Sequence, residues 1–273
     1  MAEAIQIVCR TAWRGGRLVP GTRAIPEETA IAFTFNGSSY AVMMATPHNL
    51  EDFAVGFSLT EGVIQSTTEI ERLEIVEECN GIELRLWLAE PLATAFTARR
   101  RYLAGPTGCG LCGIESLDEA MRRPAVLSDA TQFAPEEIMR ALDALTGLQE
   151  INAQTRAVHG MAFYRPGQGI VALREDVGRH NALDKLAGAL ARGHIPARGG
   201  VGLVTSRLSV EMVQKAAAIG LSVLVAVSAP TALAVRVAEA AGITLIAVAR
   251  NDGFEIFTHD HRIKEIRSIH AVA

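Results

Sequence analysis

The N-terminal part of the chain consists of short apolar runs joined by tight-turn signals. "AIAFTFNGSSYAVMMAT" places two such runs around Asn36-Gly37, and "LEIVEECNGIELRLWL" repeats the arrangement around Asn80-Gly81. Asn-Gly between alternating apolar residues is a strong signal for a β-hairpin. Between the hairpins, "TPHNLEDFAVGFSLTEGVI" predicts a helix with Thr46 as its N-cap and Pro47 at its first position. This pattern predicts a small α+β unit.

The C-terminal part alternates helices with wholly apolar strands. "APEEIMRALDALTGL" predicts an amphipathic helix, "AVHGMAFY" and "IVALRED" predict a hairpin, and "NALDKLAGALARG" predicts a helix that ends at Gly193. After it, "VGLVTS", "SVEMVQKAAAIG", "SVLVAVS", "PTALAVRVAEAAG" and "ITLIAVA" read as strand, helix, strand, helix and strand. Such alternation is typical of a parallel sheet covered on both faces. We therefore expect an α/β protein with an α+β domain over residues 1–125 and a three-layer α/β domain over 126–273.

Composition and charge exclude several classes of protein. The chain has 273 residues, of which 49% are apolar and 21% charged, and its net charge of -4 argues against nucleic-acid binding. The apolar run 216–235 is interrupted by Gly220 and Pro230, so it predicts a helix end followed by a strand rather than a membrane span. Without a secretory signal, the four cysteines are expected to be reduced thiols in the cytoplasm.

Polar side chains follow three successive strands of the predicted parallel sheet. Ligands of such sheets bind where the strands end, because the helix N-termini there favour anions. The alternative is that the Ser and Thr residues merely cap the following helices. We favour a site for a phosphate-bearing ligand, although neither GxGxxG nor a P-loop is present, and its residues are Thr205, Ser206, Arg207, Ser228, Thr231 and the segment from Arg250 to Gly253.

The run "REDVGRHNALDK" has the highest density of polar side chains in the sequence. One interpretation is structural, with Asn181 capping a helix and Asp184 facing solvent. So many hydrogen-bonding side chains around a turn at Gly178 favour a site instead. His159, taken alone in its strand, is more often a structural histidine than a ligand.

"GCGLCG" holds Cys109 and Cys112 in a CxxC spacing that has several chemical interpretations. Structural zinc requires four ligands, and no second closely spaced Cys/His pair is present. A thioredoxin-like pair belongs at a helix N-terminus after a strand, and a zinc deaminase requires an HxE motif where this chain has only "HNLE". A sulfur carrier requires a nucleophilic thiolate on a glycine-rich loop, and the nearby run 99–101 of arginines favours a thiolate. These alternatives stay open on spacing alone.

Five motifs occur in order along the chain, namely "LEDFAVGFSLTEG", "GCGLCG", "REDVGRHNALDK", "SVEMVQKAA" and "SAPTALAV". Together they resemble the FdhD family of formate dehydrogenase accessory sulfurtransferases. The resemblance implies a cytoplasmic homodimer whose C-terminal domain is similar to cytidine deaminases. It implies that sulfane sulfur passes from a cysteine desulfurase to the molybdenum of bis-molybdopterin guanine dinucleotide, which formate dehydrogenase requires. A second hypothesis is a chaperone that inserts this cofactor without moving sulfur, and a third is a zinc-dependent deaminase.

Transferred onto this sequence, the resemblance implies catalytic roles for two cysteines and cofactor contacts for a larger set, with no metal ligands in the protein. Cys109 matches the cysteine that bears the persulfide, and Cys112 matches the assisting one. The chain departs from the family where Arg156-Ala157 replaces glycines, where Thr205 replaces serine, Ser206 replaces glycine and Val248 replaces an aromatic residue. The cofactor-binding residues so predicted are His159, Gly178, Arg179, His180, Asn181, Lys185, Ser206, Arg207, Ser228, Thr231, Val248, Ala249, Arg250, Asn251, Asp252 and Gly253.

Overall fold

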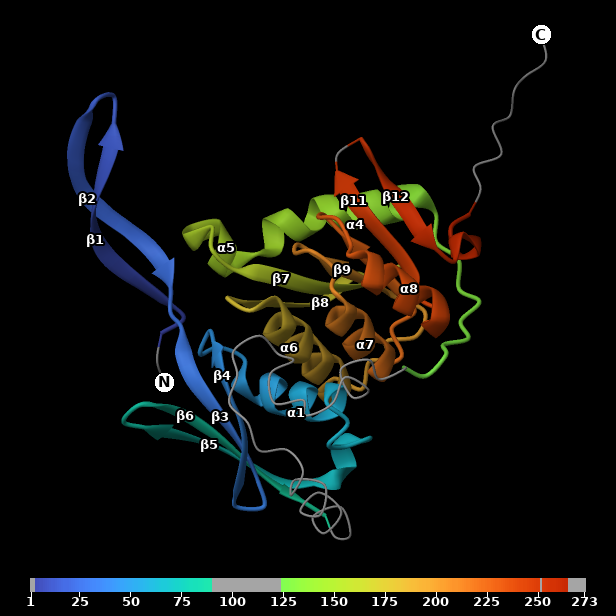
Figure 1. Cartoon of the computed structure of the whole chain (residues 1–273), viewed down its shortest axis with the longest axis horizontal. Helices are drawn as coiled ribbons and strands as arrows, with labels where there is room; N and C mark the ends of the chain where they lie inside the picture. The colour runs from blue at the N-terminus through green and yellow to red at the C-terminus, as the bar shows by residue number, and fades with distance from the viewer. Residues whose placement is uncertain (1–2, 90–123, 251, 265–273) are drawn as a thin grey trace.

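The computed structural model describes residues 3–89, 124–250 and 252–264, which form three β-sheets and the helices that cover them (Figure 1). A two-stranded ribbon consists of β1 (Ile5–Arg14) and β2 (Arg17–Pro26). The four-stranded sheet has the order β4-β3-β6-β5, made of β3 (Thr29–Phe35), β4 (Ser38–Ala45), β5 (Ile70–Glu78) and β6 (Gly81–Leu88). The six-stranded sheet has the order β12-β11-β10-β9-β7-β8, made of β7 (His159–Arg165), β8 (Gly169–Asp176), β9 (Val201–Val204), β10 (Val223–Ala226), β11 (Thr244–Arg250) and β12 (Gly253–Thr258).

Both predicted Asn-Gly hairpins are confirmed in the four-stranded sheet. Asn36 and Gly37 have φ values of 49° and 75°, and positive φ at both turn positions matches the twist of the strands that the turn joins. One face of the sheet packs on helix α1 (Leu50–Thr60), where Phe33 stacks on Phe57 with ring centroids 4.0 Å apart. The alternation predicted for β6 is also confirmed, because Ile82, Leu84, Leu86 and Leu88 are all buried on this face.

The start predicted for the helix between the hairpins is wrong. Helix α1 begins at Leu50, and its N-cap is Asn49, which has left-handed backbone geometry with φ 54°. Thr46 is buried and bonded elsewhere: its hydroxyl accepts from the Val177 N–H, and its carbonyl accepts from Lys185. A tertiary partner, rather than the local preference for a threonine cap before proline, therefore decides the position of Thr46.

The six-stranded sheet is the middle of three layers, which confirms the expected α/β class. Buried side chains of one face pack on α6 (Arg179–Arg192), α7 (Val210–Ala218) and α8 (Ala232–Ala241), and those of the other face pack on α4 (Pro135–Leu148). The short helix α5 (Glu150–Thr155) precedes β7. Strands β9, β10 and β11 pair in parallel and are buried on both faces, as their uniform apolarity predicts. The predicted boundary between domains, at residues 125 and 126, stays a prediction.

The apolar run 216–235 is divided among three elements, namely the end of α7, strand β10 and the start of α8. This confirms the expected helix end followed by a strand. Among the described residues, no helix combines the length and apolarity that crossing a bilayer requires.

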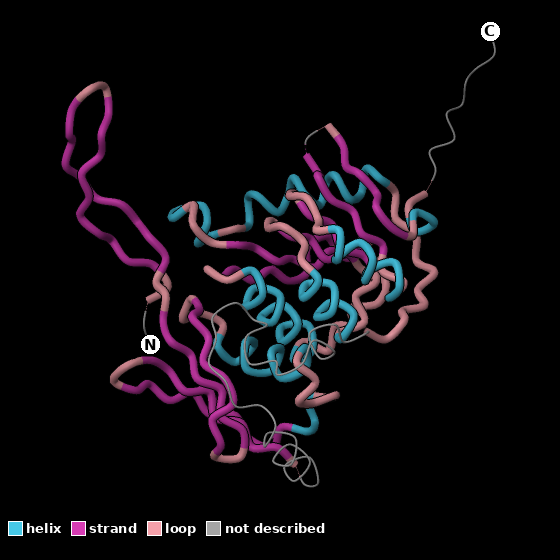
Figure 2. The backbone as a smooth tube through the Cα atoms, viewed as in Figure 1, coloured by secondary structure: helices cyan, strands magenta, loops and turns pink. Residues whose placement is uncertain are grey.

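The four-stranded sheet is joined to the six-stranded sheet through helices α1 and α6, which lie side by side (Figure 2). Glycines allow the two helices to approach: a Cβ placed on Gly56 would lie 1.6 Å from the Asp184 carbonyl oxygen, and one on Gly188 would lie 1.8 Å from that of Asp52. The Asp52 carboxylate accepts from Arg174 at 2.8 Å and from Arg192 at 2.6 Å. Backbone contact and paired charges thus fix this junction.

Candidate functional site

The carboxyl ends of four strands meet at one edge of the six-stranded sheet. Strands β8, β9, β10 and β11 run in the same direction, since β7 is antiparallel to both β8 and β9. Helices α6, α7 and α8 follow β8, β9 and β10, so their N-termini lie at this edge. Aligned N–H groups at helix N-termini favour anions. The structure therefore brings together the polar segments that follow the strands, as the sequence predicts.

The predicted residues at this edge differ in how accessible they are. Arg207, Ser228 and Arg250 are exposed. Ser206 is buried, and its hydroxyl donates to the Arg207 carbonyl at 3.2 Å. The hydroxyl of Thr231 accepts from the Ala234 N–H at 3.2 Å and caps α8. For this residue, the interpretation as a helix cap is therefore confirmed. Arg207, Arg250 and Ser228 are thus the side chains here that are free to meet a ligand.

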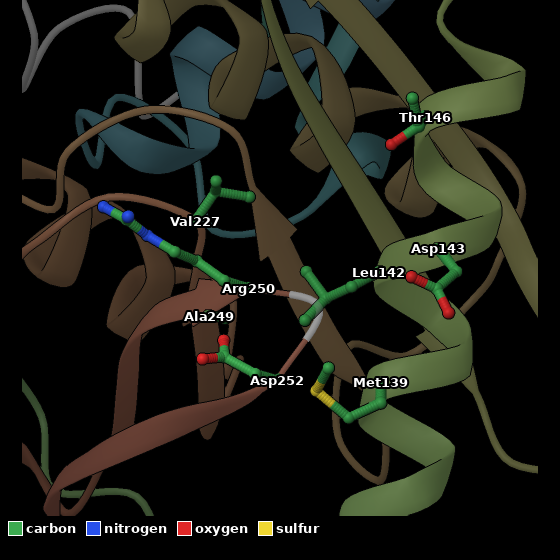
Figure 3. Close-up of a pocket in the computed structure, with 8 residues that line it drawn as sticks. All are labelled: Met139, Leu142, Asp143, Thr146, Val227, Ala249, Arg250 and Asp252. Atoms are coloured by element: carbon green, nitrogen blue, oxygen red, sulfur yellow. The ribbon is translucent and has the colours of Figure 1, made fainter.

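A cavity of about 550 Å³ opens between the ends of β10 and β11 and helix α4 (Figure 3). This volume lies within the usual range for small-molecule sites. The predicted residues Ala249, Arg250 and Asp252 line it, and Val227 lies beside them. The other lining residues come from α4 and were not predicted, because the amphipathic pattern of that helix does not tell which part of the sheet it covers: Met139, Leu142, Asp143 and Thr146.

The backbone beside this cavity is strained at Val248. Its φ is 53°, a left-handed value that a β-branched residue rarely adopts, and the pairing of β11 with β12 is irregular between Ala247 and Arg250. Irregularities of this kind are common beside functional sites, where they redirect side chains. Asn251 lies outside the described residues, and Gly253 begins β12 with φ 148°.

A second polar group lies at the same edge, around the start of β7. The Gly160 N–H donates to the Thr205 hydroxyl at 2.9 Å, which ties β7 to the end of β9 beside His159. Burial, together with the positive charge of Arg179, lowers the pKa of His159. The Nε of Arg179 is itself buried and has no hydrogen-bond partner among the described residues. Arg179 thus adds positive charge where α6 begins.

His180 bridges the N-termini of α6 and α7. Its Nε2 lies 2.5 Å from the Glu211 carboxylate and 3.4 Å from the Ser209 hydroxyl. Burial by itself raises the pKa of Glu211, but the hydrogen bond with His180 leaves that pKa below its usual value. Because both partners meet the same ring nitrogen, the group lacks the order of a catalytic triad, in which base and nucleophile use opposite nitrogens.

The structure corrects the prediction that Asn181 and Lys185 face a ligand. Lys185 is fully buried and donates to the Asp176 carboxylate at 2.5 Å and to the Thr46 carbonyl at 2.8 Å. Asn181 is 3% exposed and donates to Asp176 at 2.9 Å, and the Gly178 N–H donates to the same carboxylate at 2.7 Å. Burial lowers the pKa of Lys185, while the charge of Asp176 opposes that shift. These residues hold the loop after β4 onto α6.

The other interpretation of this motif, in which Asn181 caps a helix and Asp184 faces solvent, is also wrong. Gly178 rather than Asn181 precedes the first turn of α6, and Asp184 is fully buried. Lys215 donates to Asp184 at 2.9 Å and to Glu61 at 2.6 Å, and the Thr60 hydroxyl donates to Asp184 at 2.5 Å. Burial lowers the pKa of Lys215, but the charges of Asp184 and Glu61 outweigh it and raise that pKa. The residues of "REDVGRHNALDK" thus divide between the sheet edge and the α1–α6 junction.

The two cysteines of the CxxC spacing, Cys109 and Cys112, lie outside the described residues. In the described ranges, Cys9 and Cys79 are exposed and unpaired with one another. No group of three or more His, Cys, Asp or Glu side chains in those ranges is arranged to hold a metal ion.

The fold defines an α/β protein in which the N-termini of three helices lie at one edge of the sheet, and comparison with known proteins gives its family. Residues 26–264 match the model of the FdhD/NarQ family, and the chain belongs to that family. It is 54% identical over 257 residues to the "Sulfur carrier protein FdhD" of Agrobacterium fabrum, which covers 94% of this chain and 95% of that protein. The protein of the same name from Bordetella petrii is 44% identical over 253 residues, covering 92% of this chain and 91% of its own.

A solved structure shows the same fold. The crystal structure of a putative formate dehydrogenase accessory protein from Desulfotalea psychrophila matches with a TM-score of 0.77 and 23% identity. The match covers 96% of this chain and 100% of that one. At 23% identity, this structural similarity is evidence for the fold alone.

Proposed function

We propose that the chain is a sulfur carrier that loads the molybdenum cofactor of a formate dehydrogenase. In the proposed reaction, the Cys109 thiolate attacks the outer sulfur of a persulfide on a cysteine desulfurase. The S–S bond of the donor breaks, the donor cysteine leaves as a thiolate, and Cys109 becomes a persulfide. Cys112 assists by sheltering or resolving that persulfide. In the second step the outer sulfur of that persulfide passes to the molybdenum of bis-molybdopterin guanine dinucleotide, which is the substrate. The S–S bond breaks, Cys109 leaves as a thiolate, the proton of the persulfide is released, and molybdenum in its reduced state supplies the two electrons that convert the sulfane sulfur to a sulfido ligand.

One observation carries this proposal, namely that the family match over residues 26–264 includes both Cys109 and Cys112. The Agrobacterium relative, which is named a sulfur carrier, covers 94% of the chain. A likeness of this extent supports a common chemistry rather than one shared motif.

The sheet edge supports the choice of acceptor. A guanine dinucleotide carries a pyrophosphate and a flat base. The N-termini of α6, α7 and α8, with Arg179, Arg207 and Arg250, offer positive charge to phosphate groups. The cavity beside Arg250 offers apolar walls from Met139 and Leu142 to a base. The site therefore suits the nucleotide part of the cofactor.

The proposal includes partners and a compartment. The carrier meets a cysteine desulfurase as donor and apo formate dehydrogenase as acceptor, and it works as a homodimer. The thiol chemistry requires reduced cysteines, which the cytoplasm maintains.

The test is mass spectrometry of the chain after incubation with a cysteine desulfurase and free cysteine. We expect the added mass of one sulfur atom on the peptide that contains Cys109. Cys79→Ala is the matched control, because Cys79 is an exposed thiol on a different element. A chain that gains no sulfur, or a Cys109→Ala variant that gains as much as the wild type, contradicts the proposal.

A second candidate is a chaperone that binds and inserts the cofactor without moving sulfur. It is favoured by one observation, that the described residues form a cavity of about 550 Å³ at the sheet edge, a volume that suits the binding of a small molecule. Under this alternative, Cys109→Ala supports an active formate dehydrogenase as well as the wild type does. Under the proposal, the same variant leaves the dehydrogenase inactive.

A further inference from the structure

Helix α4 presents two faces to two different surroundings. Ile138, Ala141 and Leu145 are buried against the six-stranded sheet and form part of its core. Their spacing of three and four residues keeps them on one face of the helix. A second face, which the core does not use, lines the cavity at the sheet edge with Met139, Leu142, Asp143 and Thr146.

This cavity face of α4 combines apolar and polar side chains. Met139 and Leu142 point from the helix toward the end of β11 (Figure 3). Asp143 and Thr146 are exposed, and neither side chain has a hydrogen bond or ion pair with another residue that the structure describes. An apolar wall beside a few polar groups without partners is the usual composition of a small-molecule site.

The charges of the cavity favour a base over a phosphate. Among the described residues that line it are two carboxylates, Asp143 of α4 and Asp252 of the β11–β12 turn, and one cation, Arg250. The Arg250 side chain extends away from α4 (Figure 3). Carboxylates repel the phosphates of a nucleotide, whereas Arg250 attracts them. A nucleotide at this edge therefore directs its base, rather than its phosphates, toward α4.

The polar side chains of α4 match the hydrogen-bonding edge of guanine. Guanine presents two adjacent donors, N1–H and the 2-amino group, and then the acceptor O6. Asp143 offers two acceptor oxygens and Thr146 offers a hydroxyl donor. Residues three apart on a helix have Cβ atoms about 5–6 Å from each other, so both can reach one base. Adenine and cytosine each present an acceptor nitrogen in place of N1–H, and a carboxylate repels it.

We propose that Asp143 selects guanine by accepting hydrogen bonds from N1–H and the 2-amino group, while the Thr146 hydroxyl donates to O6. Met139 and Leu142 then contact the apolar face of the base. The ligand is a guanosine diphosphate group, either free or as part of the dinucleotide cofactor. The inference rests on the proposed function for the cofactor, and it names the residue that distinguishes a guanine dinucleotide from one with another base.

The experiment is isothermal titration calorimetry of the full-length chain with GDP, IDP, XDP and CDP. IDP lacks the 2-amino group of GDP, XDP has an oxygen in its place, and CDP has a pyrimidine as its base. We expect the wild type to bind GDP about tenfold more tightly than each of the other three. One lost hydrogen bond of about 1.4 kcal/mol corresponds to this factor.

Asp143→Asn is expected to reverse the order of two ligands. The asparagine amide accepts from N1–H of xanthine and donates to its 2-oxygen, whereas it cannot accept from both donors of guanine. We therefore expect this variant to bind XDP about tenfold more tightly than GDP. A residue that only supports the shape of the cavity does not reverse this order when its charge is removed.

The matched control is Glu136→Gln, which removes one negative charge from an exposed residue in the first turn of α4, outside the cavity lining. It is expected to keep the order of the four ligands and to leave the Kd for GDP within about threefold. Circular dichroism melts show that the variants are folded. A wild type that binds GDP and IDP equally or binds neither, an Asp143→Asn chain that still prefers GDP, or a control that prefers XDP overturns the proposal.

Analysis of the chain purified from cells that make the cofactor distinguishes the two sources of guanine. We expect molybdenum together with guanine in the acid extract, and both are expected to fall about tenfold in Asp143→Asn. Guanine without molybdenum, or neither of them, overturns the assignment to the cofactor. None of these measurements involves a thiol. Their failure therefore leaves the persulfide chemistry standing, and failure of the persulfide test leaves the selection of guanine standing.

Discussion

Gly56→Ala is the most demanding test of how helices α1 and α6 are joined. The added Cβ would lie 1.6 Å from the Asp184 carbonyl oxygen and 2.6 Å from the Gly188 nitrogen. Ordinary contacts of this kind are about 3.4 Å or longer, so α1 must retreat by nearly 2 Å. Both obstacles are backbone atoms, which cannot rotate away as a flexible side chain can.

The magnitude follows from what this retreat disturbs. Overpacking a close-packed interface costs about 1–3 kcal/mol. A displacement of this size also lengthens the Thr60–Asp184 and Lys215–Thr60 hydrogen bonds, which are 2.5 Å and 3.1 Å long and are worth about 1 kcal/mol each. We expect the free energy of unfolding to fall by about 3–5 kcal/mol, and Tm to fall by about 6–20 °C for a chain of this size.

The assay is urea and thermal denaturation followed by circular dichroism, with Gly147→Ala as the matched control. Gly147 also lies in a helix, but a Cβ there meets nothing within 4 Å. The control is therefore expected to gain about 0.5–1 kcal/mol from the higher helix propensity of alanine. A Gly56→Ala chain that unfolds within about 0.5 kcal/mol of the wild type, with an unchanged m value, would refute this account of the junction.

Three further predictions concern buried and strained positions. Lys185→Met leaves the Asp176 charge buried without its partner, so urea denaturation is expected to show that the free energy of unfolding falls by about 3–5 kcal/mol. The matched control is Lys264→Met at an exposed lysine, which is expected to lower the free energy of unfolding by less than about 0.5 kcal/mol. Arg156 has a left-handed backbone conformation with φ 58° at the end of α5, and Arg156→Gly removes the strain that a side chain causes there. We expect the free energy of unfolding to rise by about 0.5–1 kcal/mol and Tm to rise with it, and a lower Tm contradicts this. The lowered pKa of His159 favours its neutral form in the folded chain, so its contribution to stability is complete above pH 6.5 and declines as the pH falls below that value. His159→Gln is expected to flatten the dependence of unfolding free energy on pH in this range, and an unchanged slope would count against that role.

Much of the fold was accessible from local sequence patterns. The Asn-Gly turns, the alternation along β6 and the apolar strands β9, β10 and β11 each depend on neighbours in the chain, and all of them are confirmed. The segments at the sheet edge were predictable for the same reason, because parallel strands bring their carboxyl ends together wherever such a sheet forms. The likeness of the C-terminal domain to cytidine deaminases stays a prediction.

What local patterns did not determine is which polar side chains reach the site. Lys185, Asn181 and Asp184 belong to the same motif as His180, but the approach of α1 to α6 buries them. A buried polar side chain requires a hydrogen-bond partner. The motif alone does not tell whether that partner is a ligand or another part of the chain, and only the tertiary structure decides this.

The sequence by itself determined the class of the protein and its family, because these depend on residue types and their spacing. Only the tertiary structure placed Met139 and Asp143 of α4 beside Arg250, set Thr46 against Lys185, and left the β1–β2 ribbon uncovered. Such contacts join residues far apart in the chain. They depend on which faces the layers present to one another, and periodicity within one segment does not specify that choice.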